Sequence, residues 1–117
     1  MKLEYITFMV RDIEKSLSFY QELVGLKVVR RFSPGMGKIA FVVNEEGEIM
    51  LELIQFENVE KVQTKGMVMS FAANEELNVL REKACRMGLE PTEIIAKGPK
   101  PAYFRVCDPD GIIVEFS

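Results

Sequence analysis

The first half of the chain opens with a period of two that changes to a helical period. Every second residue of Tyr5–Val10, counted from Ile6, is bulky and apolar, which predicts a half-buried strand. After Asp12, a suitable N-cap, apolar residues recur at spacings of four, three and four, which predicts a helix with one buried stripe. The stripe consists of Ile13, Leu17, Tyr20 and Val24. Gly25 then stands where a left-handed C-terminal cap is expected.

Short apolar runs between turn residues predict the other strands. Three should follow the first helix, over Leu26–Phe32, Ile39–Val43 and Ile49–Ile54. The second half repeats this order, with a strand over Val68–Ala73 and a helix that Asn74 caps and Gly88 ends. Its stripe consists of Leu77, Leu80, Ala84 and Met87. Three more strands are predicted near Pro91–Ile95, Ala102–Cys107 and Ile112–Phe116. The turn Asp108–Gly111 has Asp, Pro and Gly where a type I turn prefers them.

The two halves align on each other at a constant shift of 63 positions, without a gap. The shift aligns Phe8 with Phe71, Gly25 with Gly88, Phe41 with Phe104, Val43 with Val106, and Glu52 with Glu115. We therefore predict two βαβββ modules, 1–57 and 65–117, joined by a polar connector over 58–64. Because one module has too little apolar surface to be stable alone, the chain should form a single α+β domain over 1–117.

Alternation along the strands sorts their side chains onto two faces. The face under the helices should carry Phe8, Phe41, Leu51, Leu53, Phe71, Phe104, Val114 and Phe116. The opposite face mixes aromatic, apolar, hydroxyl and charged side chains, which is the composition of a ligand cleft. The predicted cleft residues are Tyr5, Thr7, Met50, Glu52, Val68, Ser70, Tyr103, Arg105 and Glu115.

Composition narrows the chemistry. The 117 residues include 18 acidic and 15 basic side chains, a balance that argues against a nucleic-acid partner. The absence of histidine excludes imidazole ligands, imidazole bases and histidine-containing triads. The two cysteines, Cys85 and Cys107, are too few for a thiolate zinc cage and are expected to be free, buried thiols. The sequence shows neither a signal peptide nor a membrane span, so we expect a cytoplasmic protein with no membrane partner.

Two segments carry a resemblance to a known family. Residues 10–29, which begin Val-Arg-Asp-Ile-Glu-Lys-Ser-Leu, resemble the opening module of the vicinal oxygen chelate superfamily, and residues 104–116 resemble the close of its second module. That superfamily includes glyoxalase I, bleomycin-resistance proteins and extradiol dioxygenases. The resemblance implies paired βαβββ modules whose mixed sheets curl into an incomplete barrel around a cleft. It also implies a homodimer.

The resemblance locates a metal site and shows how this chain departs from it. Metal-dependent members bind a divalent cation with four side chains, commonly two histidines and two glutamates. Those positions fall on Tyr5, Glu52, Val68 and Glu115 of this sequence. Both carboxylates match and both imidazoles are missing, so two monodentate ligands would leave a divalent ion short of donors. We therefore predict no cofactor and a place in the metal-free branch, which binds small molecules; a divalent metal is the alternative.

Three functions stay open at this point. The first is a glyoxalase/bleomycin-resistance-like protein that binds a small molecule without a metal. The second is a metal-dependent enzyme that uses Glu52 and Glu115 as catalytic residues, either a lactoylglutathione-lyase-like lyase or isomerase, or a dioxygenase-like enzyme. The third is a structural dimer with a filled cleft. If the two glutamates share a cleft, the pKa of one should rise, which suits a general base. Alternatively, the pair attracts a cationic ligand, or one or both glutamates pair with Arg105 or reach solvent. Arg105 could instead bind a carboxylate or phosphate of a substrate. The cleft could form within one chain or across a dimer.

Overall fold

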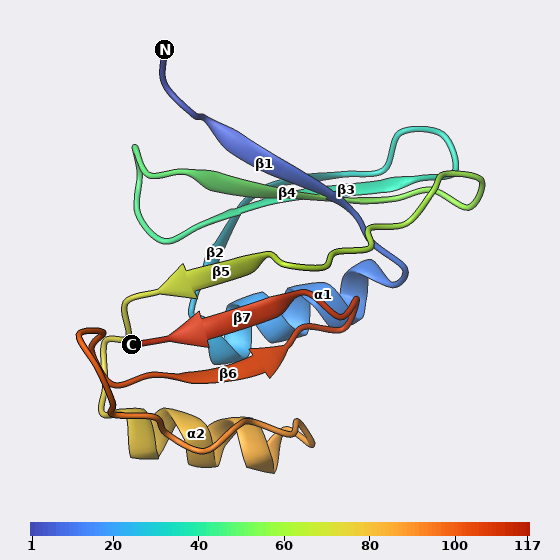
Figure 1. The fold of residues 1–117 in the computed structure, drawn as a ribbon. Coiled ribbons are helices and arrows are strands. Elements are labelled where there is room, and N and C mark those ends of the chain that lie inside the picture. The colour runs from blue at the N-terminus through green and yellow to red at the C-terminus, as the bar shows by residue number, and fades with distance from the viewer. The chain divides into compact units, whose positions relative to one another are not determined.

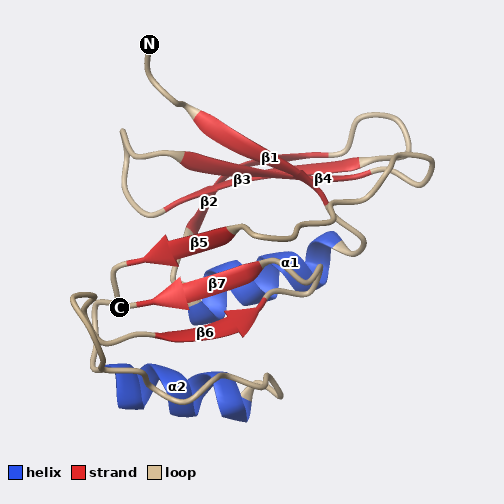
Figure 2. Ribbon diagram, viewed as in Figure 1, coloured by secondary structure: helices blue, strands red, loops and turns tan.

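Each half of the chain folds around its own mixed β-sheet (Figure 1; Figure 2). The computed structural model describes all 117 residues, and they divide into a first unit, Met1–Val62, and a second unit, Gln63–Ser117. The boundary lies inside the segment predicted as a connector. Because both units combine helix with mixed sheet, the predicted α+β fold class is confirmed. None of the helices has both the length and the apolar character that crossing a membrane requires.

The first unit contains all four strands predicted for it. Its elements are β1 (Tyr5–Met9), α1 (Ile13–Ser18), the π-helical turn η1 (Phe19–Leu23), β2 (Lys27–Phe32), β3 (Lys38–Val43) and β4 (Met50–Gln55). The sheet order is β1-β4-β3-β2, with β1 parallel to β4 and the other pairs antiparallel. The apolar side chains of α1 and η1 are buried with those of β1 and β4, which forms the core of this unit.

Both ends of the first helical segment are capped as predicted. The side chain of Asp12 accepts hydrogen bonds from the backbone N–H groups of Glu14 and Lys15, which satisfies two donors of the first turn. At the other end Gly25 has a φ of +85°, and the N–H of Leu26 donates to the carbonyl of Tyr20. A left-handed residue costs least when it is glycine, so Gly25 lets the chain turn into β2.

Gly37 allows the loop before β3 to approach an aromatic ring. A Cβ atom at this position would lie 2.2 Å from Cε1 of Phe56, well inside van der Waals contact. We expect Gly37→Ala to lower the free energy of unfolding by about 1–3 kcal/mol, because the ring must move aside. Urea denaturation measures the loss. In a Phe56→Ala background the same substitution should cost much less; an equal cost in both backgrounds would assign the loss to the backbone instead.

The second unit has one strand fewer than predicted. Its elements are β5 (Val68–Phe71), α2 (Leu77–Arg86), β6 (Phe104–Cys107) and β7 (Ile113–Phe116). The sheet order is β5-β7-β6, with β5 parallel and β6 antiparallel to β7. Its core combines Leu80 and Ala84 of α2 with the buried side chains Phe104, Val106, Val114 and Phe116 of the sheet.

The strand predicted near Pro91–Ile95 is wrong. Only one isolated bridge joins Ile95 to Tyr103, and one backbone hydrogen bond runs from Thr92 to Arg105. Pro91 has no N–H to donate to a ladder. The Arg81 guanidinium of α2 donates to the carbonyl of Thr92 at 2.7 Å, so a side chain occupies an acceptor that a neighbouring strand would use.

For α2, the predicted C-terminal cap is confirmed and the predicted N-cap is wrong. The N-cap is Glu76 rather than Asn74, and its side chain makes no capping hydrogen bond. Gly88 has a φ of +81° just after the helix, as predicted, and the N–H of Leu89 donates to the carbonyl of Ala84. The two helices therefore begin in different ways and end alike.

The register of β3 corrects one face assignment. Phe41 lies directly opposite Glu52, whereas Ala40 lies opposite the buried Leu53. Paired residues share a face of a sheet, so Phe41 belongs with Glu52 and not under the helix. Its ring makes an edge contact with Tyr5, at 5.4 Å between centroids. The other helix-side assignments agree with the registers of the two sheets.

The same register shows that the repeat is not free of gaps. In the second unit Glu115 lies opposite Arg105, so the counterpart of Phe41 is Arg105 and not Phe104. These two positions are 64 apart, while β1–β4 and β5–β7 keep the shift of 63. The β6–β7 hairpin is thus one residue shorter than the β3–β4 hairpin. The predicted ungapped alignment of β3 with β6 is wrong.

Candidate functional site

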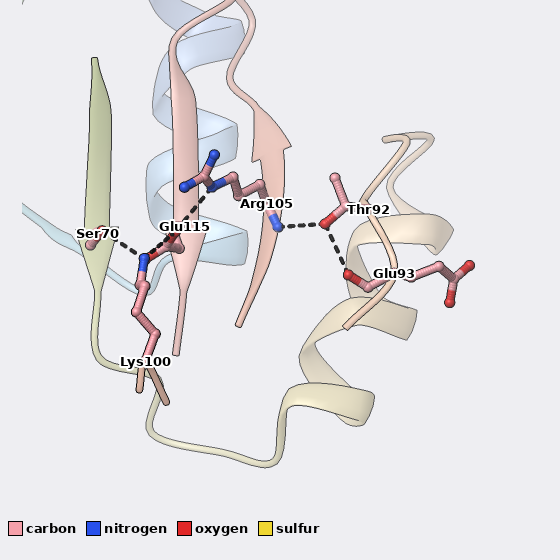
Figure 3. A network of polar contacts seen from close by, with 6 residues as sticks. All are labelled: Ser70, Thr92, Glu93, Lys100, Arg105 and Glu115. Carbon is pink, nitrogen blue, oxygen red and sulfur yellow. Dashed lines mark hydrogen bonds and ion pairs between the residues drawn. The ribbon is translucent and has the colours of Figure 1, made fainter. Parts of the chain in front are cut away.

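A buried carboxylate forms the centre of a polar cluster in the second unit (Figure 3). Glu115 on β7 lies between two cross-strand neighbours, Ser70 on β5 and Arg105 on β6. Arg105 Nε donates to Glu115 Oε1 at 3.0 Å, and Ser70 Oγ donates to Oε2 at 3.2 Å. Lys100 Nζ, from the loop before β6, lies 3.1 Å from Oε1 and 3.0 Å from Oε2. One glutamate thus binds two cations and a hydroxyl.

The carboxylate of Glu115 is ionised, and its hydrogen-bond partners fix its position. Only 3% of its surface is exposed, and burial by itself raises the pKa of a carboxyl group. Hydrogen bonds from Lys100, Arg105 and Ser70 outweigh burial, so the pKa of Glu115 lies below its ordinary value. Among the alternatives left open by the sequence, pairing with Arg105 is confirmed for this residue. A raised pKa is therefore not found at Glu115.

An aromatic ring accompanies the two cations. Lys100 Nζ lies 4.4 Å from the ring centroid of Tyr103, and Arg105 Cζ lies 5.3 Å from it. Both distances are in the range of cation–π attraction. The sequence predicted Tyr103 and Arg105 for this face but not Lys100. Alternation assigns a face only to residues within a strand, and Lys100 lies in the loop before β6. No sequence motif indicates its role either.

The matching face of the first unit has aromatic rings beside its carboxylate, and its one nearby cation, Arg30, pairs with Phe41 across β2 and β3. Thr7 Oγ1 donates to Glu52 Oε1 at 2.6 Å, and their positions are paired across β1 and β4. The ring of Phe41, opposite Glu52, contacts Tyr5 and lies 6.0 Å from Arg30 Cζ. Glu52 therefore has one hydroxyl partner among rings, whereas Glu115 has three polar partners.

The predicted site residues fall into two groups, one in each unit. The first group is Tyr5, Thr7, Met50 and Glu52, and the second is Val68, Ser70, Tyr103, Arg105 and Glu115. Within each group the strand registers place the paired residues on one face. The approach of Glu52 to Glu115, and a ligand role for either group, stay predictions.

A surface pocket of about 560 Å³ lies elsewhere in the first unit. It opens between the N-terminal segment and the loop after β3, and Met50 is the one predicted site residue that lines it. Its charged lining consists of Lys2, Glu4, Lys27, Glu45, Glu46 and Glu48. This pocket contains no aromatic side chain, so it is a different environment from the sheet face around Glu52.

The residues at the family's metal-ligand positions do not fit a metal ion. No group of three histidine, cysteine, aspartate or glutamate side chains is arranged to hold one. A divalent ion at Glu115 would have to displace both Lys100 and Arg105 from the carboxylate. Val68, at another of the four positions, offers no donor atom.

Neutralising Glu115 should make stability less dependent on pH. Because the pKa of Glu115 is lowered in the folded protein, the unfolded chain binds more protons as the pH falls below about 5, and the contribution of this group is lost there. At pH 7 we expect Glu115→Gln to lower the free energy of unfolding by about 1–2 kcal/mol, since its partners are partly exposed. Urea denaturation from pH 7 to pH about 3 measures the difference.

The gap between the native protein and Glu115→Gln should narrow as the pH falls. The matched control is Glu93→Gln, because Glu93 also pairs with an arginine but its side chain is 89% exposed. This control should change stability by less than about 0.5 kcal/mol at either pH. A gap for Glu115→Gln that is as large at pH about 3 as at pH 7 would contradict the role of ionised Glu115.

The chain is similar to a known family and to a curated protein over nearly its whole length. The profile of the Glyoxalase/Bleomycin resistance protein/Dioxygenase superfamily matches residues 2–116. The uncharacterized protein YwbC of Bacillus subtilis (strain 168) is 31% identical over 121 residues, which cover 98% of this chain and 95% of that protein.

Solved structures share the fold. The glyoxylase/bleomycin resistance protein/dioxygenase domain from Frankia sp. EAN1pec has a TM-score of 0.78 at 21% identity, over 99% of this chain and 95% of that chain. TnmS3, an antibiotic binding protein from Streptomyces sp. CB03234, has a TM-score of 0.76 at 19% identity, over 100% and 94%. The fosfomycin resistance protein FosX from Mesorhizobium loti has a TM-score of 0.76 at 17% identity, over 98% and 89%. The chain therefore belongs to the glyoxalase/bleomycin resistance protein/dioxygenase superfamily, as its opening and closing segments indicated.

Proposed function

We propose that this protein binds a small organic molecule, without a metal ion, on the sheet face of the second unit that carries Glu115. The observation that carries the proposal is the state of Glu115. Two cations and a hydroxyl satisfy its carboxylate, so it acts as a structural anchor and not as a metal ligand. The side chains around it, the half-buried Tyr103 and the 38% exposed Val68, offer apolar contact area.

The first unit supports the same function. Its face combines the rings of Tyr5 and Phe41 with the single carboxylate of Glu52. Aromatic side chains give a large contact area at low conformational cost and stack on flat ligands. The name of TnmS3 describes an antibiotic binding protein, so this fold is used for binding in at least one similar protein.

The proposal also covers the cellular location and the oligomeric state of the protein. Both cysteines are free, and both are exposed, which corrects the expectation that they are buried. Exposed free thiols persist in reducing compartments, which supports a cytoplasmic location. The family resemblance supports a homodimer, and size-exclusion chromatography with light scattering tests it.

A neutral aromatic probe tests metal-free binding. We expect 2-naphthamide to bind the purified protein in equilibrium dialysis, with the same affinity in EDTA as with added Mn²⁺. Tyr103→Ala should weaken binding about five- to tenfold, the range that one aromatic contact supports. The control Met36→Ala removes an exposed apolar side chain of a loop and should change nothing. Stoichiometric metal in the purified protein, together with binding that EDTA abolishes, would contradict the proposal and favour the metal-dependent alternative.

A further inference from the structure

The guanidinium group of Arg105 uses only one of its three nitrogens for a hydrogen bond within the protein. Its Nε donates to Glu115, and this is the one hydrogen bond that its side chain makes. The backbone N–H of the same residue donates to Thr92 Oγ1 at 2.9 Å, which fixes the strand on the other side (Figure 3). The two terminal nitrogens therefore form an unused donor edge. This edge has the spacing that a carboxylate or phosphate accepts in a bidentate manner.

The charges of the cluster do not cancel. Lys100 and Arg105 supply two positive charges, and Glu115 supplies one negative charge between them (Figure 3). The third nearby side chain, Ser70, is neutral. The side chain of Glu93 lies in an ion pair with Arg81 and does not compensate the cluster. One positive charge remains, and 37% of the Arg105 side chain is exposed to receive an anion.

The side chains around the unused donor edge of Arg105 indicate what the ligand should carry besides an anionic group. The ring of Tyr103 lies beside both cations, and Val68 and Ile113 are paired apolar neighbours on the same face. An anion with an aromatic body would contact the guanidinium and the ring together. Glu115 would then act as a positioning residue, because it fixes the guanidinium without touching the ligand.

We propose that Arg105, oriented by Glu115, recognises the anionic group of the ligand, and that this ligand is an aromatic molecule with one carboxylate or phosphate. The inference deepens the proposed function and rests on it. It differs from the alternative of a cationic ligand, because the carboxylate of Glu115 already pairs with Lys100 and Arg105.

Three probes of matched shape test the inference. These are 2-naphthoate, 2-naphthyl phosphate and the neutral 2-naphthamide, each measured with the native protein by isothermal titration calorimetry. We expect at least one anion to bind about tenfold more tightly than the amide, as a bidentate charged contact supports, and the preference should fall as salt is raised. The ratio of the two anions then identifies the group that the site takes.

Variants assign the preference to Arg105. Arg105→Gln should reduce the anion preference to about one, and Arg105→Lys should keep about two- to threefold, because it retains the charge but not the fork. Arg86→Gln, which removes an exposed arginine of α2, changes the net charge equally and should leave the preference intact. Because Arg105→Gln removes a partner of a buried carboxylate, Arg105→Gln/Glu115→Gln is measured beside it, and circular dichroism verifies folding.

The outcomes separate this inference from the proposed function. Loss of the preference in the Arg105 variants but not in Arg86→Gln supports the inference. Binding of 2-naphthamide without any anion preference overturns this inference and leaves metal-free binding in place. A preference that survives in a folded Arg105→Gln/Glu115→Gln protein also overturns it. Failure of all three probes to bind overturns both.

Discussion

Replacing Phe104 with alanine is expected to lower the free energy of unfolding by about 3–5 kcal/mol, the range for a large aromatic side chain removed from a core. Phe104 on β6 is fully buried, with an exposed fraction of 0%. Its ring centroid lies 5.3 Å from that of Phe116, which in turn stacks on Phe71 at 6.2 Å. The substitution removes apolar contacts and leaves a cavity that β6 cannot close. A domain of this size has a stability of about 5–15 kcal/mol, so the loss is a large part of the whole.

Urea denaturation followed by circular dichroism at 25 °C measures this effect. Phe32→Ala is the matched control, because Phe32 lies on the edge strand β2 and is 40% exposed. We expect this control to lose about 1 kcal/mol or less, since burial determines the size of the effect. Equal losses for the two variants would mean that Phe104 is not part of a packed core.

The second large effect is expected at the turn before β7. The side chain of Asp108 is buried, and its Oδ1 accepts the N–H of Asp110 at 2.8 Å and the N–H of Ile112 at 2.9 Å. Asp108→Ala would leave both donors without this partner, and that of Ile112 is buried. Since hydrogen bonds to charged groups contribute about 1.5–3 kcal/mol each and are not fully additive, we expect a loss of about 2–4 kcal/mol.

Asp108→Asn separates the hydrogen bonds from the charge. Asparagine keeps the acceptor oxygen, so this variant should lose no more than about half as much stability as Asp108→Ala. The free energy of unfolding from urea titration at pH 7 gives both values. Similar losses for the two variants would show that the negative charge, and not the acceptor, stabilises the turn.

Much of the fold was accessible from the sequence because local chemistry determines it. The cap at Asp12, the left-handed residues Gly25 and Gly88, and the strand-forming runs are each specified by a few neighbouring residues. The turn at Asp108 is of this kind too, since the N–H of Gly111 donates to the carbonyl of Asp108 as a type I turn requires.

The predictions from the sequence were wrong where contacts between distant segments determine the structure. Alternation along β3 allows Phe41 either face, and only its partner on β4 settles which one. Residues near Thr92 resemble a strand, but a guanidinium from α2 takes the hydrogen bond that a strand would need. The pair Arg105–Glu115 could be anticipated as an alternative. Lys100 could not, because a loop between prolines has no period that would direct its side chain.

The difference in hairpin length has a consequence for exchanging residues between the two halves. Because the missing residue leaves the strand pairing intact, Arg105 and not Phe104 takes the place of Phe41. A graft onto β6 at an offset of 63 would put outward-facing side chains of β3 into the core beside Phe116, whereas β5 and β7 accept residues of β1 and β4 at that offset. Designs that copy one face onto the other therefore need an offset of 64 on β6.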